Sequence, residues 1–152
     1  MPIEYFLASI VSYLGLLLGV ILIKLAPEEQ KPGKKYFILF KKILLFLIIA
    51  IFFSFIKINA VIVILLLIIL FFFLINKKIT LESTVLTYIL FGILFTLSFR
   101  IQNLFIIESV LIFLYGIPTA SLILNVKKKN YKDVFVKNLL FFVPVIVFYF
   151  IL

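Results

Sequence analysis

Long apolar runs separated by short polar breaks dominate the pattern of this chain. The runs are 16 to 21 residues long, and an α-helix of about 20 residues, rising about 1.5 Å per residue, crosses a hydrocarbon core of about 30 Å. The pattern therefore predicts an all-α, polytopic integral membrane protein that forms one transmembrane domain over residues 1–152. The six predicted transmembrane helices cover residues 3–23, 36–55, 60–75, 79–99, 104–124 and 134–152.

The first polar break, Ala26–Lys35, is unsuited to the bilayer interior. Pro27 and Pro32 each remove a backbone donor, and a charged side chain at mid-depth costs roughly 2.5 to 3.5 kcal/mol. We expect a solvated cytoplasmic loop on which a partner protein docks. The side chains expected to serve for docking are Glu28, Glu29, Lys34 and Lys35. The two glutamates are adjacent and point in different directions, so a metal site formed by this pair is the weaker interpretation.

Lysine and arginine residues are distributed unevenly among the polar breaks. Thirteen lie in or beside the first, third and fifth breaks, whereas the second and fourth contain Lys57 and Arg100. The positive-inside rule then places the odd-numbered breaks in the cytoplasm and both chain ends outside, as three out-in-out hairpins in the plasma (cell) membrane. We expect the net charge of +9 to act on anionic lipid headgroups rather than on nucleic acid.

Composition narrows the chemistry that the chain can perform. Hydrophobic residues make up 66% of the chain and the mean hydropathy is +1.40, whereas apolar residues make up roughly 45 to 50% of soluble domains. Because the chain has no cysteine and no histidine, it cannot form disulfides, thiol nucleophiles or imidazole bases. The sequence contains no nucleophile elbow, P-loop or dinucleotide-binding glycine motif. We therefore expect no enzymatic activity, no cofactor and no metal.

Small and polar residues recur at helical spacing in three of the predicted helices. The first helix carries a packing face of Ala8, Ser12, Gly15 and Gly19, and its two glycines form a GxxxG pattern that permits close approach of another helix. The fourth and fifth helices carry stripes of Thr84, Tyr88, Gly92 and Thr96, and of Glu108, Tyr115, Gly116 and Thr119. Because polar groups avoid lipid, we expect the first, fourth and fifth helices at the centre and the others toward lipid.

Four residues form the candidate intramembrane polar site. They are Glu108, Arg100, Glu4 and Tyr115. Glu108 is expected near the outer face, about 6 Å below the start of its helix. One interpretation makes Glu108 the titrating or coordinating group of an ion, proton or substrate site, with Arg100 as its counter-ion. The other makes both residues anchors of helix ends at the membrane interface. On the cytoplasmic side, Glu82 beneath a Thr80 cap either faces a pore opposite Lys77 or Lys78, or only compensates the dipole of its helix.

These patterns leave two main hypotheses for function. The leading one is a non-enzymatic integral membrane subunit or scaffold that binds a membrane-protein partner or forms a homo-oligomer, because the stripes and basic breaks require nothing beyond packing. The alternative is a small transporter or channel subunit with a polar site among the first, fourth and fifth helices. A lipid-acting enzyme is a distant third. Replacing Glu108 with glutamine separates them, since transport or catalysis would collapse and a scaffold would persist.

Overall fold

The computed structural model describes residues 3–56, 60–75, 84–124 and 131–151, and within these ranges the chain is helical and has no strand. The prediction of an all-α chain is therefore confirmed for the described ranges. The expected Thr80 cap and Glu82 lie outside them. The elements in chain order are α1 (Ile3–Leu25), η1 (Pro27–Glu29), α2 (Gln30–Phe55), α3 (Ala60–Ile75), α4 (Thr84–Ser98), α5 (Gln102–Ile123), α6 (Tyr131–Val136), η2 (Lys137–Phe141) and α7 (Phe142–Ile151).

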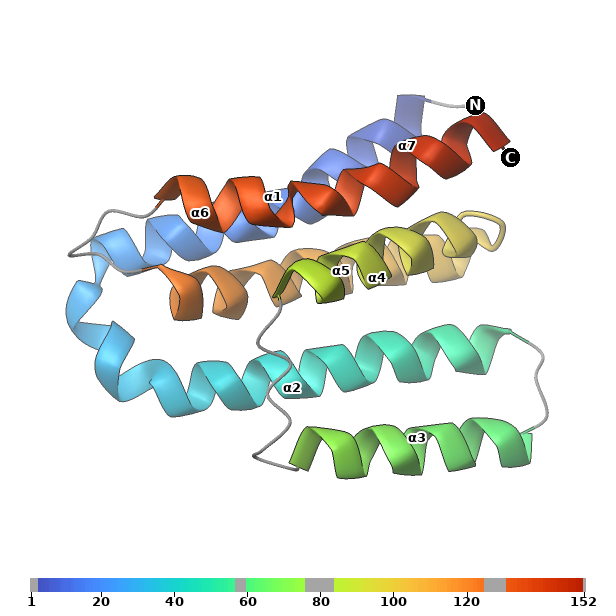
Figure 1. Cartoon of the computed structure of the whole chain (residues 1–152), viewed down its shortest axis with the longest axis horizontal. Coiled ribbons are helices and arrows are strands. Elements are labelled where there is room, and N and C mark those ends of the chain that lie inside the picture. The colour runs from blue at the N-terminus through green and yellow to red at the C-terminus, as the bar shows by residue number, and fades with distance from the viewer. Residues whose placement is uncertain (1–2, 57–59, 76–83, 125–130, 152) are drawn as a thin grey trace.

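The helices lie side by side along the long axis of the molecule (Figure 1). Helix α1 and the α6–η2–α7 segment form one layer, α4 and α5 the next, and α2 and then α3 follow below. Helix α5 is central, because it packs against α1, α2 and α4. Helix α4 also packs against η2 and α7, whereas α3 packs against α2. The start of α1 and the end of α7 lie at the same end of the bundle (Figure 1).

Three of these helices are long and apolar enough to cross a membrane. They are Ile3–Leu25, Pro27–Phe55 and Gln102–Ile123. Two further apolar segments, Thr84–Ser98 and Val134–Phe150, are shorter. Many large hydrophobic side chains, such as Leu7, Leu65 and Phe72, are exposed, and extensive exposed apolar surface marks contact with a membrane or another protein. Length, composition and surface together indicate a membrane protein.

The break after the first helix is much shorter than the expected Ala26–Lys35 loop. Ala26 follows α1, a 3₁₀ turn covers Pro27–Glu29, and α2 begins at Gln30. The expectation of a loop was therefore wrong for the segment that contains Lys34 and Lys35. Pro32 is tolerated because backbone N–H groups in the first turn of a helix have no intrahelical acceptor to lose.

Backbone-to-backbone contact joins α1 to α5. A Cβ added at Gly15 or Gly19 would clash with the carbonyl oxygens of Phe113 and Ile117, respectively. From the other side, a Cβ at Gly116 would lie 2.5 Å from the backbone nitrogen of Leu16. The absence of side chains at these positions allows the two helices, which run parallel, to approach this closely.

Hydrogen bonds reinforce the positions of the first two helices. The Ser12 hydroxyl hydrogen-bonds to the Ser109 carbonyl at 3.1 Å. At the start of α2, the Gln30 side-chain amide donates to the carbonyls of Ser121, at 2.9 Å, and Leu124 at the end of α5. The carbonyls at a helix C-terminus lack intrahelical donors, so Gln30 satisfies this end of α5 while it fixes α2 against it.

Helix α2 contributes more to the core than its sequence indicated. We expected it to face lipid, but four of its side chains are buried: Leu44, Leu45, Ile48 and Phe52. Their spacing places them on one face, and α2 packs against α5. The prediction that only the first, fourth and fifth helices form the centre was therefore wrong for α2. It was also wrong for the α6–η2–α7 segment, where Val134, Asn138, Phe141 and Val145 are buried. A uniformly apolar helix gives no periodic signal that distinguishes a protein-facing leucine from a lipid-facing one.

Candidate functional site

Most buried hydroxyl and amide donors in the bundle are satisfied by their own helix. Each donates to a carbonyl three or four residues earlier, and these donors are Ser9, Ser12, Thr96, Ser98, Ser109, Ser121 and Asn138. Such local bonds allow polar side chains to lie in an apolar helix bundle without partners elsewhere. A buried polar atom that lacks any partner is therefore unusual in this molecule.

A few buried polar atoms in the described part of the chain have no hydrogen-bond partner. They are the hydroxyls of Tyr88, Tyr115 and Thr119, both carboxyl oxygens of Glu108, and the Asn138 side-chain oxygen. Three of these residues, Glu108, Tyr115 and Thr119, recur along α5 at intervals of seven and four residues and so share one face. We call these three residues the α5 polar row. Tyr88 faces this row from α4, with its ring centroid 6.2 Å from that of Tyr115.

Glu108 is the most unusual member of the row. It lies in the second turn of α5, has no exposed surface, and makes no hydrogen bond to the described residues. We expected a carboxyl close to the headgroups, where either the protein or the interface could surround it. In the structure, packed helices surround Glu108, so its side chain faces protein. An ionised carboxylate in such surroundings costs several kcal/mol unless a charge or hydrogen bonds compensate it.

The structure brings together only part of the candidate polar site. Glu108 and Tyr115 lie on the same face of α5, whereas Glu4 and Arg100 are exposed. Arg100 lies in the turn between α4 and α5 and does not supply a hydrogen bond to Glu108. The expected pairing of Arg100 with Glu108 is therefore absent here.

Lys41 belongs to this region, although the sequence gave it no functional role. Its Nζ atom lies 5.7 Å from the centroid of the Tyr115 ring, within the range of a cation–π interaction. Lys41 is half-buried. Its spacing of four and seven residues from Leu45 and Ile48 places it on the buried face of α2. That spacing is the signal that could have identified Lys41 as a protein-facing residue rather than one that extends toward the headgroups.

Hydroxyl groups surround the phenol of Tyr115. Thr87 and Thr119 lie within reach of its hydroxyl, although the Tyr115 hydroxyl does not form a well-aligned hydrogen bond. Lys41, Tyr115, Thr119 and Tyr88 therefore form a polar region at the junction of α2, α4 and α5. By helical rise, Glu108 lies about 10 Å from Tyr115 along the axis of α5.

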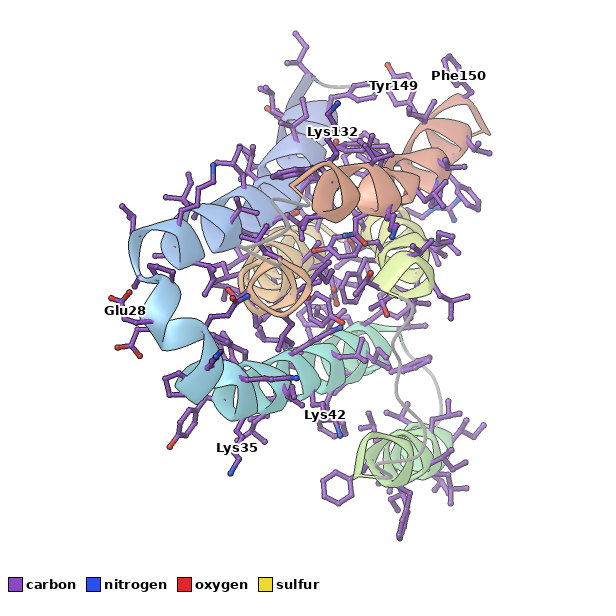
Figure 2. All side chains as sticks on the ribbon, turned by 60° about the vertical axis from the view of Figure 1, so that its left-hand side comes forward. Glu28, Lys35, Lys42, Lys132, Tyr149 and Phe150 are labelled. Atoms are coloured by element: carbon purple, nitrogen blue, oxygen red, sulfur yellow. The ribbon has the colours of Figure 1, made fainter. Side chains whose placement is uncertain are left out.

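The expected docking residues lie on the surface, away from this junction. Glu28 and Glu29 are exposed in the turn between α1 and α2, and Lys34 and Lys35 are exposed on the first turns of α2. Figure 2 shows Glu28 and Lys35 pointing outward. Among the described residues, no group of three or more acidic, cysteine or histidine side chains could hold a metal ion.

Compared with protein-family models, with curated proteins and with solved structures, the chain matches none. The arguments for function therefore rest on the residues and their geometry.

Proposed function

We propose that this protein spans the plasma membrane six times, with both chain ends outside and the basic connections in the cytoplasm. The three long apolar helices and the shorter apolar segments support this topology. So does the position of the α1 start and the α7 end at one end of the bundle (Figure 1). Lysines such as Lys24, Lys31 and Lys35 are exposed near the opposite end, where anionic headgroups would attract them.

Within this topology, we propose a non-enzymatic role as a membrane-embedded subunit or scaffold. The observation that carries this proposal is the position of α3. Helix α3 packs against α2, with Phe71 contacting Phe46 at a ring-centroid distance of 6.3 Å. Ile62 and Ile69 lie on the opposite face and are at least half exposed. Figure 2 shows α3 at the edge of the bundle, beyond α2, so this face is open to a membrane-protein partner or a second copy.

The test is purification from native membranes in a lipid-preserving medium, followed by mass spectrometry of the intact particle. We expect a stoichiometric second protein or a second copy of this chain. Replacing Ile62 and Ile69 with alanine should release it, because these side chains would form the contact. The matched control replaces Leu7 and Leu14, which are exposed on α1, and should retain the partner. A monomer without a partner in the native preparation would contradict the scaffold proposal.

A second candidate, a small transporter or channel subunit, is favoured by one observation. Glu108 is completely buried without a partner on the helix at the centre of the bundle, and ionisable residues inside membrane domains commonly mark ion or proton pathways. The test is ion and proton flux into vesicles that contain the purified protein. Glu108→Gln should abolish the flux, and Glu4→Gln, which changes an exposed carboxyl, should not. Equal flux with the wild type and Glu108→Gln would exclude this role for the site.

A further inference from the structure

We propose that Glu108 is a reversible proton-binding site, neutral while the helices enclose it and able to release its proton to solvent water when they open. The proposal deepens the transporter candidate. A role for this proton in transport rests on the proposed transporter function, whereas the binding of the proton to Glu108 can be tested without it. The transferred group is a proton alone. The O–H bond of the carboxyl breaks when the proton passes to a solvent water molecule, and the electron pair remains on the carboxylate.

Burial supports the neutral form. Both carboxyl oxygens are enclosed and unpartnered, and no exposed surface connects Glu108 to solvent. Desolvating a charge without a partner costs several kcal/mol, whereas a protonated carboxyl carries no charge to desolvate. The structure therefore describes the bundle in the state in which the acid retains its proton.

The surroundings of Glu108 favour a proton over a metal cation as its ligand. Hard cations such as calcium take six to eight oxygen ligands at roughly 2.3 to 2.6 Å. The other members of the α5 polar row, Tyr115 and Thr119, lie about 10 and 16 Å along the axis from Glu108 by helical rise. They cannot share one ion with it. A proton needs only the carboxyl.

An ionised Glu108 would interact with any charged side chain on the helices packed around α5, so the titratable groups on those helices determine the charge that it meets. From α1, the Tyr5 and Tyr13 hydroxyls donate to the carbonyls of Val145 and Phe135, so these hydroxyls are already engaged. From α4, Tyr88 contributes a neutral phenol.

From α2, Lys41 contributes a cation beside Tyr115. On ionising, Glu108 would be attracted by the positive charge of Lys41, which lies beside Tyr115, another member of the α5 polar row. This attraction would favour the carboxylate form of Glu108.

Infrared difference spectroscopy during a pH titration tests the proposal directly, with the full chain in phosphatidylcholine–phosphatidylglycerol nanodiscs. A protonated carboxyl without a hydrogen bond absorbs at higher frequency than a bonded one. The wild type should show this band at low pH and lose it as pH rises, with a carboxylate band appearing in its place. Glu108→Gln should lack the band, and Glu4→Gln should retain it. A wild-type spectrum identical to that of Glu108→Gln, or a band that persists until the protein unfolds, would overturn the proposal.

Two substitutions at Lys41 keep the test decisive if Glu108→Gln does not fold. Lys41→Met removes the positive charge and should make the band persist to a higher pH, because the Glu108 carboxylate then loses the attraction of that cation. Lys41→Arg retains the charge and should titrate as the wild type does. A band insensitive to both the charge at Lys41 and pH would contradict the proposal. A titrating band without flux into vesicles would refute the transporter function while leaving the proton site intact.

Discussion

Adding one methyl group at Gly116 should separate the two helices that form the centre of the bundle. The Cβ of Gly116→Ala would lie 2.5 Å from the Leu16 nitrogen, and 2.6 and 2.9 Å from the carbonyl carbon and Cα of Gly15. All three atoms belong to the α1 backbone, so no side-chain rotation can make room. Ordinary contact begins at 3.4 Å, so α1 must move by about 0.9 Å (3.4 − 2.5 Å).

Two destabilising contributions and one stabilising contribution set the change in the free energy of unfolding. Forcing a methyl group into a filled contact costs about 1 to 3 kcal/mol, and a displaced α1 also weakens the Ser12–Ser109 hydrogen bond, which contributes about 1 kcal/mol. Alanine in place of glycine returns up to about 1 kcal/mol through its higher helix propensity. We therefore expect Gly116→Ala to lower the free energy of unfolding by about 2 kcal/mol.

Equilibrium unfolding in mixed micelles of dodecylmaltoside and SDS, followed by circular dichroism, measures this loss. The matched control is Gly33→Ala in the first turns of α2, where the nearest atoms to an added Cβ are those of the Phe37 ring, from 2.9 Å. That ring can rotate away, so the control should be as stable as the wild type or slightly more stable. If Gly116→Ala unfolds at the same SDS fraction as Gly33→Ala, the backbone contact between α1 and α5 is not as described.

Three further substitutions test individual interactions by the same unfolding measurement. Tyr5→Phe removes a buried hydroxyl bonded to Thr96 and to the Val145 carbonyl and should cost about 1 to 2 kcal/mol; an unchanged stability would contradict these bonds. Tyr88→Phe removes a buried hydroxyl without a partner and should be neutral or stabilising, so a clear loss would reveal a missing partner. Gln30→Ala should cost about 1 to 2 kcal/mol by leaving carbonyls at the end of α5 without donors, whereas the exposed neighbour Lys31→Ala should be neutral.

The sequence was most informative where polar and small residues interrupt the apolar background. The run lengths indicated the helices, and the spacing of Ser12, Gly15 and Gly19 indicated a face on α1 that lies against α5 in the structure. Glycine and serine in a lipid-soluble helix are conspicuous because a larger apolar residue would fit equally well against lipid.

The sequence analysis missed positions at which a charged type of residue lies against protein rather than at the surface. Lys41 is one of the basic residues counted beside the first break, whose charge was expected to act on lipid headgroups, yet it lies next to Tyr115 on the protein-facing side of α2. For Glu108, the sequence did not show whether the side chain faces protein or the lipid headgroups. Its burial is set by α1, α2 and α4, which pack around α5, and a one-dimensional pattern contains no information about these neighbours.

Pro32 provides a third example. Pro27 and Pro32 indicated a loop, but the first turn of a helix accepts a proline such as Pro32 without losing a backbone hydrogen bond. Helix α2 therefore begins at Gln30, directly after the 3₁₀ turn, and includes the proline that had indicated a loop.

Cysteine accessibility in intact cells tests the central claim, a bundle that crosses the membrane with alternating direction. Because the chain has no cysteine, each substitution gives a unique reporter. With a membrane-impermeant maleimide, Ile101→Cys in the turn between α4 and α5 should react from outside, and Glu28→Cys in the turn between α1 and α2 should react only after the membrane is opened. Both positions are exposed in the structure, so reaction of both from the same side would contradict the proposed topology.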